Sequence, residues 1–338
     1  MTSIPLSVGL DYHQDSVQVC VLNEQGSVIL NRSLSNDARG IVRAVAPRGQ
    51  VRSVAIEACC GAAALADELI GRSNWPVQLA HPGYVARLKQ SPDKTDFSDA
   101  RLLADLGRVG YLPKVWLAPE ELRRLRRLVR HRQQLVKVRK NVKLRIRALL
   151  RENRLRARGC KAWTKPWLAW VASEDGLVKD DRWLMNQHLA ELSHLAGLLK
   201  AVEKRLKERA ASDPVIQKLL TFDSVGLVTA VTIRAEVGQF DRFNTGKQLA
   251  RFCGVSPRNA SSGQRQADAG LIKAGNPGLR MVLIELGQRL ICRKEGRWST
   301  LGHHLLRGGK PRNVAVAAVA NRWVRWLYHE MQPTMLET

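Results

Sequence analysis

The sequence has no long apolar run and no cysteine pair with metal-binding spacing. None of its 338 residues lies in a stretch that approaches the roughly 20 apolar residues of a membrane-spanning helix. The first residues, 1–5, lack the layout of a signal peptide. The six cysteines form no Cys-x-x-Cys pair, and the adjacent Cys59 and Cys60 do not suit a zinc site. We therefore expect a cytoplasmic protein with reduced core cysteines and no membrane partner.

The basic charge is concentrated in one part of the chain. The net charge is +25, yet residues 1–110 contain 11 basic and 11 acidic side chains. The remaining 228 residues carry 44 basic and 19 acidic side chains. A neutral region joined to a strongly basic one favours a polyanionic partner. An anionic membrane surface would also attract this charge, but the chain has no aromatic-rich amphipathic helix and no lipidation motif.

The first part of the chain has an α/β pattern with acids at two strand ends. Apolar or alternating segments predict five strands, at 7–11, 16–21, 27–30, 51–57 and 77–82. A helix is expected after the fourth strand, from the turn at Gly61 to Ile70. Asp11 and Glu57 end the first and fourth strands, and strand ends are where α/β sheets usually place functional groups.

Two further acids, Asp96 and Asp99, are three residues apart in the segment Lys94–Ala100. This spacing places both carboxylates on one helical face, and the pattern that follows predicts a helix start. One interpretation is capping, with one Asp as N-cap and the other in the first turn. The other is that Asp11, Glu57, Asp96 and Asp99 converge as oxygen ligands for Mg²⁺.

The middle of the chain is expected to be a basic helical arm. Residues 122–155 contain no glycine or proline, and their apolar spacing predicts one long helix of coiled-coil character. Residues 122–158 contain 16 basic side chains and one acid, Glu152. We therefore expect these charges to lack partners within the chain and to meet phosphates. A second helix, at 181–209, packs back on the first or pairs with another protomer. The four tryptophans at 163, 167, 170 and 183 are core anchors or, alternatively, stacking platforms for bases.

The last part of the chain is expected to be mainly helical. Residues 222–230 resemble a helix-hairpin-helix element, whose amides can meet a phosphate, although a plain turn between helices fits equally well. A polar loop contains Ser261, Ser262 and Gly263, and Asn276 with Pro277 begins a new helix. On chemistry alone, a serine before glycine in such a loop is a turn residue.

Asp11, Glu57, Asp96 and Asp99, with the Lys-Thr-Asp-x-x-Asp-Ala signature at 94–100, resemble the catalytic domain of the DEDD insertion-sequence transposases. That family includes Piv-type invertases and bridge-RNA-guided recombinases. The segment 254–280 is similar to the second signature of the same family, so the resemblance covers nearly the whole chain. It implies an N-terminal domain of the RuvC type, within the ribonuclease H class.

The resemblance also implies a mechanism, partners and a setting. A serine attacks a DNA phosphodiester; by position this is Ser262, with Ser261 the alternative. The four acids bind Mg²⁺ or Mn²⁺, which activates that hydroxyl. We expect donor and target DNA and a bridge-type guide RNA as partners. We also expect a dimer or tetramer, with the two halves of the site on different protomers, in association with the bacterial nucleoid. The expected nucleic-acid contacts are Arg123, Arg127, Arg130, Lys137, Arg258, Arg265, Lys273 and Arg280, although the last four suit solubility equally well.

Three domains are expected: a catalytic domain at 1–112, a basic arm at 113–210 and a helical domain at 211–338. Two other functions fit the sequence. A junction endonuclease of the Holliday type would use the metal and water, with a structural Ser262. A nucleic-acid-binding protein would keep the fold without catalysis.

Overall fold

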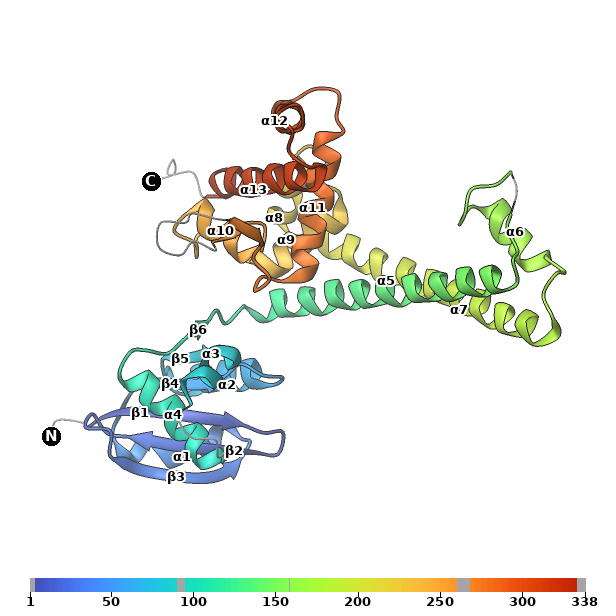
Figure 1. Cartoon of the computed structure of the whole chain (residues 1–338). Coiled ribbons are helices and arrows are strands. Elements are labelled where there is room, and N and C mark those ends of the chain that lie inside the picture. Colours follow the sequence, from blue (N-terminus) through green and yellow to red (C-terminus); the bar gives the residue numbers. More distant parts are fainter. Residues whose placement is uncertain (1–3, 90–94, 158, 260–267, 333–338) are drawn as a thin grey trace. The chain divides into compact units, whose positions relative to one another are not determined.

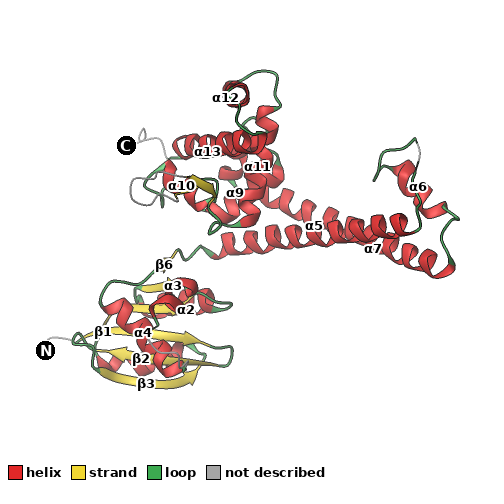
Figure 2. Cartoon of the chain, viewed as in Figure 1, coloured by secondary structure: helices red, strands yellow, loops and turns green. Residues whose placement is uncertain are grey.

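The computed structural model describes residues 4–89, 95–157, 159–259 and 268–332 (Figures 1 and 2). Contacts within the chain define two compact units, Met1–Ala118 and Pro119–Thr338. The end of the first unit lies close to the predicted boundary at residue 112. A separate arm and C-terminal domain within the second unit remain a prediction. No helix in the described part of the chain is long and apolar enough to cross a membrane.

The first unit is built on a six-stranded sheet with the order β3-β2-β1-β4-β5-β6 (Figure 1). The strands β1, β2 and β3 form an antiparallel meander, whereas β4 and β5 run parallel to β1. The short β6 pairs antiparallel with β5. This mixed sheet is consistent with the expected ribonuclease-H-like class. The strands are Pro5–Tyr12 (β1), Ser16–Leu22 (β2), Val28–Ser35 (β3), Gln50–Glu57 (β4), Val77–Ala80 (β5) and Lys114–Val115 (β6).

The two faces of this sheet carry different side chains because residues alternate along each strand. One face buries Leu10 and Ile56 in an aliphatic core that includes residues of α1 (Ala38–Val45) and α2 (Ala62–Ser73). The opposite face has small residues, including Gly9 and Ala55, against the helix α4 (Asp96–Arg108). The α1/α2 face therefore holds most of the apolar core, and the small-residue face brings α4 close to β1. The other helical segments of this unit are η1 (Ala46–Arg48) and α3 (Pro82–Leu88).

The second unit begins with two long helices, α5 (Glu120–Glu152) and α7 (Lys179–Ala211), which pack side by side (Figure 1). They are antiparallel, because Arg132 pairs with Glu203 and Arg145 pairs with Glu191. The apolar positions predicted for the first helix are buried, at 122, 125, 129, 135, 142, 146 and 149. The alternative in which the second helix packs back on the first is confirmed, whereas coiled-coil character is not.

Three of the four clustered tryptophans belong to the hairpin core. Trp167 lies in α6 (Lys165–Ser173) and is buried, and Trp163 and Trp170 pack against the same cluster. Trp183 is 61% exposed, because it projects from α7 outside that cluster. The core interpretation is therefore confirmed for the first three and wrong for Trp183.

The rest of the second unit is mainly helical (Figure 2). Its core includes Trp323 and Leu286 and is continuous with the start of α5 and the end of α7, through Leu125, Val129 and Leu206. The sequence did not predict the short hairpin of β7 (Pro257–Asn259) and β8 (Asp268–Leu271). The helices are α8 (Pro214–Leu220), α9 (Leu227–Val237), α10 (Gly246–Phe252), α11 (Pro277–Ile291), α12 (Arg297–Arg307) and α13 (Arg312–Glu330).

The cysteines are only partly in the core. Cys20 and Cys253 are buried, but Cys59, Cys60 and Cys292 are exposed. The prediction of core cysteines is therefore wrong for those three. Cys59 and Cys60 lie in the turn between β4 and α2, and Cys292 follows the end of α11, so none projects from a core-facing position.

Candidate metal centre and nucleic-acid-binding surfaces

Two of the four predicted acids lie at one edge of the sheet in the first unit. Asp11 is near the carboxyl end of β1, and Glu57 is the last residue of β4. The two strands are parallel, and Leu10 is opposite Ile56, so the next residues along, Asp11 and Glu57, are neighbours. Because Leu10 and Ile56 face the α1/α2 core, alternation directs both acids to the face that α4 covers.

The other two acids, Asp96 and Asp99, are in the first turn of α4. The helix is capped by Thr95, whose hydroxyl accepts a hydrogen bond from the amide of Ser98 at 3.2 Å. The interpretation in which one Asp is the N-cap is therefore wrong. Neither carboxylate is used for the cap, and both are stabilised by the positive end of the helix dipole.

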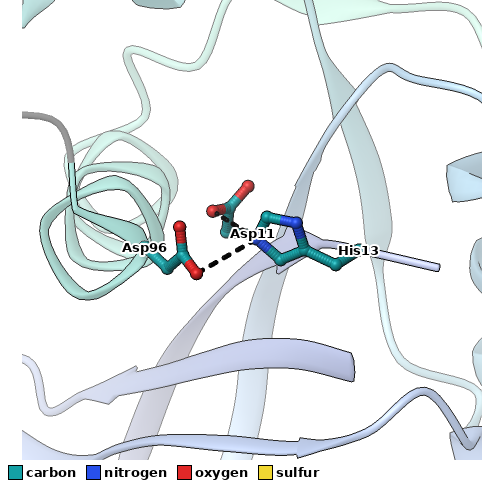
Figure 3. A group of neighbouring side chains, drawn as sticks. All are labelled: Asp11, His13 and Asp96. Carbon is teal, nitrogen blue, oxygen red and sulfur yellow. Dashed lines mark ion pairs between the residues drawn. The ribbon is translucent and has the colours of Figure 1, made fainter. Parts of the chain in front are cut away.

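A histidine joins two of these acids (Figure 3). His13 Nε2 lies 3.4 Å from Oδ2 of Asp11 and 3.2 Å from Oδ2 of Asp96. One ligand atom from each of the three residues lies within 4.8 Å of the other two. His13 was not among the residues predicted from the sequence. Its only sequence signal is that it follows Asp11 by two residues, in the turn between β1 and β2.

The electrostatics of Asp11 show that the other three acids act on it. Burial raises the pKa of the Asp11 carboxyl, and the negative charges of Asp96, Asp99 and Glu57 raise it further, whereas His13 opposes the rise. Each neighbouring carboxylate therefore makes ionisation of Asp11 less favourable. A divalent cation at this edge of the sheet would reverse that effect, because it stabilises every carboxylate in its ionised form.

Asp99 differs from the other acids because it already has a cationic partner. Its side chain is 10% exposed, and its Oδ2 accepts a hydrogen bond from Nζ of Lys89 at 2.7 Å. Lys89 directly follows α3 and was not among the residues predicted from the sequence. The ammonium group of Lys89 offsets the cost of burying a carboxylate at this position.

The donor groups of the cluster fit a divalent metal ion. Asp11 and Asp96 offer carboxylate oxygens, and His13 offers an imidazole nitrogen. Carboxylate oxygens suit Mg²⁺ and Mn²⁺, and imidazole suits transition ions. The residues present are therefore compatible with the divalent-metal dependence that the sequence resemblance implies.

The candidate nucleophiles Ser262 and Ser261, and also Arg265, lie outside the described residues. Among the flanking cations, Arg258 on β7 and Lys273 after β8 are exposed. Arg280 is instead a structural residue, because its Nη1 donates to the backbone carbonyl of Ile272 at 2.7 Å. This hydrogen bond holds the segment between β8 and α11 in place.

The basic helix α5 has more acidic partners than its sequence indicated. Hydrogen bonds from Arg127, Arg123 and Arg124 lower the pKa of Glu120 to about 2. Arg130 makes two 2.9 Å hydrogen bonds to Glu236 on α9. The expectation that these charges lack partners is therefore wrong for three residues chosen as phosphate contacts, Arg123, Arg127 and Arg130. Their acidic partners lie just before the counted segment or far along the chain.

The distal half of α5 still has basic side chains outside the ion pairs found among the described residues. Lys137, the fourth residue chosen in this helix, is exposed and belongs to this set. The set, called here the distal basic surface, consists of the exposed residues Lys137, Lys140, Arg147 and Arg151. These four side chains are free to meet phosphates without first breaking a salt bridge.

Comparison with known proteins gives consistent matches along the chain. A family model for DEDD transposases of the IS110 type matches residues 8–154, and the model of the transposase IS116/IS110/IS902 family matches residues 216–303. The chain is 32% identical over 288 residues to the transposase for insertion sequence element IS1111A of Coxiella burnetii, covering 85% of this chain and 78% of that protein.

Two other relatives match almost end to end. A probable family 20 transposase of Pseudomonas aeruginosa is 28% identical over 330 residues, and the match covers 95% of each chain. The transposase for insertion sequence element IS1328 of Yersinia enterocolitica is 25% identical over 322 residues, covering 94% of each. These matches confirm the resemblance inferred from the acids and the C-terminal signature. The chain belongs to the IS110-type family of DEDD insertion-sequence transposases.

Proposed function

We propose that this protein is the transposase of a mobile element and that it cleaves and rejoins DNA in a metal-dependent reaction. The observation that carries this proposal is the cluster of Asp11, His13 and Asp96, with Glu57 and Asp99 close enough to act on Asp11. Such a cluster is costly for stability, because the negative charges around Asp11 raise the pKa of its carboxyl. A bound divalent cation would offset this cost, because it stabilises the ionised carboxylates.

Within this proposal, the bound Mg²⁺ or Mn²⁺ would lower the pKa of an attacking hydroxyl and stabilise charge on the phosphoryl oxygens. Residues of this chain position the acids that would hold the ion. The short contact between α4 and β1 fixes Asp96 beside Asp11. The ammonium of Lys89 holds Asp99 in one position. Glu57 adds negative charge from the adjacent strand.

The proposed nucleophile is Ser262, which belongs to the second family signature, with Ser261 as the alternative. The serine hydroxyl would give up its proton as its Oγ forms a bond to phosphorus. The bond from phosphorus to a sugar oxygen would break, and that oxygen would take up a proton and leave as a hydroxyl, so no proton is gained or lost overall. The phosphodiester energy is kept in the serine–DNA ester. In the reverse reaction, a sugar hydroxyl attacks the ester, restores the DNA backbone and releases the serine. Rejoining therefore needs no external energy source.

The proposed partners are donor and target DNA, a structured guide RNA and further copies of the chain. Support for nucleic-acid binding comes from the net charge of +25 and from the distal basic surface on α5. Arg258 and Lys273 add exposed cations beside the β7–β8 hairpin. Counterion release on binding phosphates supplies affinity without base specificity. The guide RNA and the dimer or tetramer rest on the family resemblance.

The test uses a nicked suicide substrate, in which the cleaved strand cannot be resealed. Wild-type protein should give DNA covalently attached to protein on denaturing gels. Ser262→Ala should lose this species and, on an intact substrate, should lose cleavage and joining together, while keeping nucleic-acid affinity. Ser261→Ala is the matched control and should retain all three.

Three other results would contradict this assignment and favour an alternative. Loss of the covalent species only in Ser261→Ala would make that serine the nucleophile. Cleavage by both variants would favour the endonuclease that uses water. Nucleic-acid binding without cleavage by wild-type protein, at any Mg²⁺ or Mn²⁺ concentration, would favour the non-catalytic alternative.

A further inference from the structure

His13 lies in a turn whose backbone is fixed on both sides. Its amide donates to the carbonyl of Ser16 at 2.9 Å. The side-chain amide of Asn36 donates to the carbonyls of His13 and Gln14, each at 3.0 Å. Asn36 follows the end of β3, so the edge of the meander positions the turn. The imidazole is therefore attached to an ordered backbone, although the side chain itself is 47% exposed.

The distances around His13 agree with those between neighbouring ligands of one octahedral ion. Ligand atoms at about 2.1 Å from an ion are about 3.0 Å apart when adjacent and about 4.2 Å apart when opposite. His13 Nε2 lies 3.4 Å and 3.2 Å from oxygens of Asp11 and Asp96, and all three ligand atoms lie within 4.8 Å of one another (Figure 3). Small movements of two exposed side chains, His13 and Asp96, would bring the three atoms to ligand spacing.

We infer that His13 Nε2 is a direct ligand of the catalytic ion, together with Asp11 and Asp96, and that it makes the centre prefer Mn²⁺ to Mg²⁺. This inference rests on the metal dependence in the proposed function and goes beyond the four-acid ligand set. Mg²⁺ favours oxygen ligands and keeps much of its water, so a nitrogen ligand adds little to its binding. Transition ions accept imidazole, and the two carboxylates keep the centre suitable for Mn²⁺.

The test compares wild-type full-length protein with His13→Asn, in which an amide oxygen replaces the nitrogen. His81→Asn is the matched control. His81 is an exposed histidine directly after β5, and its Nδ1 accepts a hydrogen bond from the amide of Gly83 at the start of α3. Asparagine is a favoured residue at such a helix start, so the control should fold normally.

Two measurements on each protein give readouts other than activity. Calorimetric titration with Mn²⁺ and with Mg²⁺ gives the two dissociation constants. Electron spin echo measurements on bound Mn²⁺ detect a directly coordinated nitrogen. His13→Asn should weaken Mn²⁺ binding on the order of 10- to 100-fold, the range found when groups that support a metal ligand are removed. Its Mg²⁺ affinity should change by no more than a few-fold, and the nitrogen signal should disappear.

His81→Asn should match wild type in both measurements. The inference is overturned if wild type binds Mn²⁺ without a nitrogen signal, or if His13→Asn keeps the signal and the affinity. In either case metal dependence itself would stand. If wild type binds neither ion and cleaves DNA without metal, the metal-dependent part of the proposed function fails, and the role of His13 fails with it.

Discussion

Gly9→Ala tests whether the close approach of α4 to β1 builds the centre. Gly9 lies two residues before Asp11 and faces α4. A Cβ at this position would lie closer than 3.0 Å to the carbonyl oxygen of Ala100 and to the amide nitrogen of Ala104. Both atoms belong to the helix backbone, which cannot rotate away as a flexible side chain can. The methyl group therefore has to displace α4 or distort β1.

The expected cost follows from this geometry. Overpacking a well-packed site with one methyl group destabilises by about 1–3 kcal/mol. To restore ordinary contact, α4 would have to withdraw by about 1 Å, and a displacement of that size can lower activity by about 100-fold. Asp96 and Asp99 would move away from Asp11 together, because both are carried by the first turn of α4.

Gly71→Ala is the matched control. Gly71 is in α2, and a Cβ there would meet no atom within 4 Å. Alanine in a helix is about 0.5–1 kcal/mol more favourable than glycine, so this variant should be more stable than wild type. Chemical denaturation measures both free energies of unfolding, and Mn²⁺ titration measures the centre. The reasoning is refuted if Gly9→Ala is as stable as wild type and binds Mn²⁺ equally well.

Two further predictions concern charge. Burial and neighbouring acids raise the pKa of Asp11, so its ionised form destabilises the folded state above that pKa. Asp11→Asn should therefore raise the metal-free melting temperature at pH 7, and the gain should shrink as the pH falls below the raised pKa; an equal gain at all pH values would contradict this electrostatic cause. On the distal basic surface, a change of all four residues to Gln should flatten the slope of log K against log salt for nucleic-acid binding by about 3. The salt-bridged set Arg123, Arg124 and Arg127, changed to Gln, should flatten it less; equal effects would mean that the ion pairs do not restrain those arginines.

The sequence predicted the elements that carry the acids because local signals were sufficient. Short apolar or alternating segments predicted the strands that contain Asp11 and Glu57, and helical spacing predicted the helix that begins at Asp96. The order of these elements also predicted an α/β layout. Each of these inferences depends on residues that are close together in the sequence.

The features that the sequence did not predict depend on distant contacts or on single residues. Glu236 neutralises Arg130 from 106 positions away, so a charge count along α5 could not include it. His13 is a lone histidine in a turn, and only the position of α4 gives it a second acidic neighbour. Lys89 follows a short helix, and its pairing with Asp99 needs the fold of the segment between them. In each case the tertiary structure supplies the partner.

The cluster is best understood as a balance between repulsion and three compensating interactions. The charges of Asp96, Asp99 and Glu57 raise the cost of ionising Asp11, which destabilises the folded state unless other groups oppose it. Lys89 compensates Asp99, the most buried of the four. The start of α4 stabilises both of its aspartates, and His13, which lies beside Asp11 and Asp96, opposes the rise in the pKa of Asp11. Lys89 and His13 differ in one respect that matters for function. The Lys89–Asp99 pair is largely buried, whereas His13 and Asp96 are exposed, so a metal ion can enter on the side of His13 without breaking the buried pair.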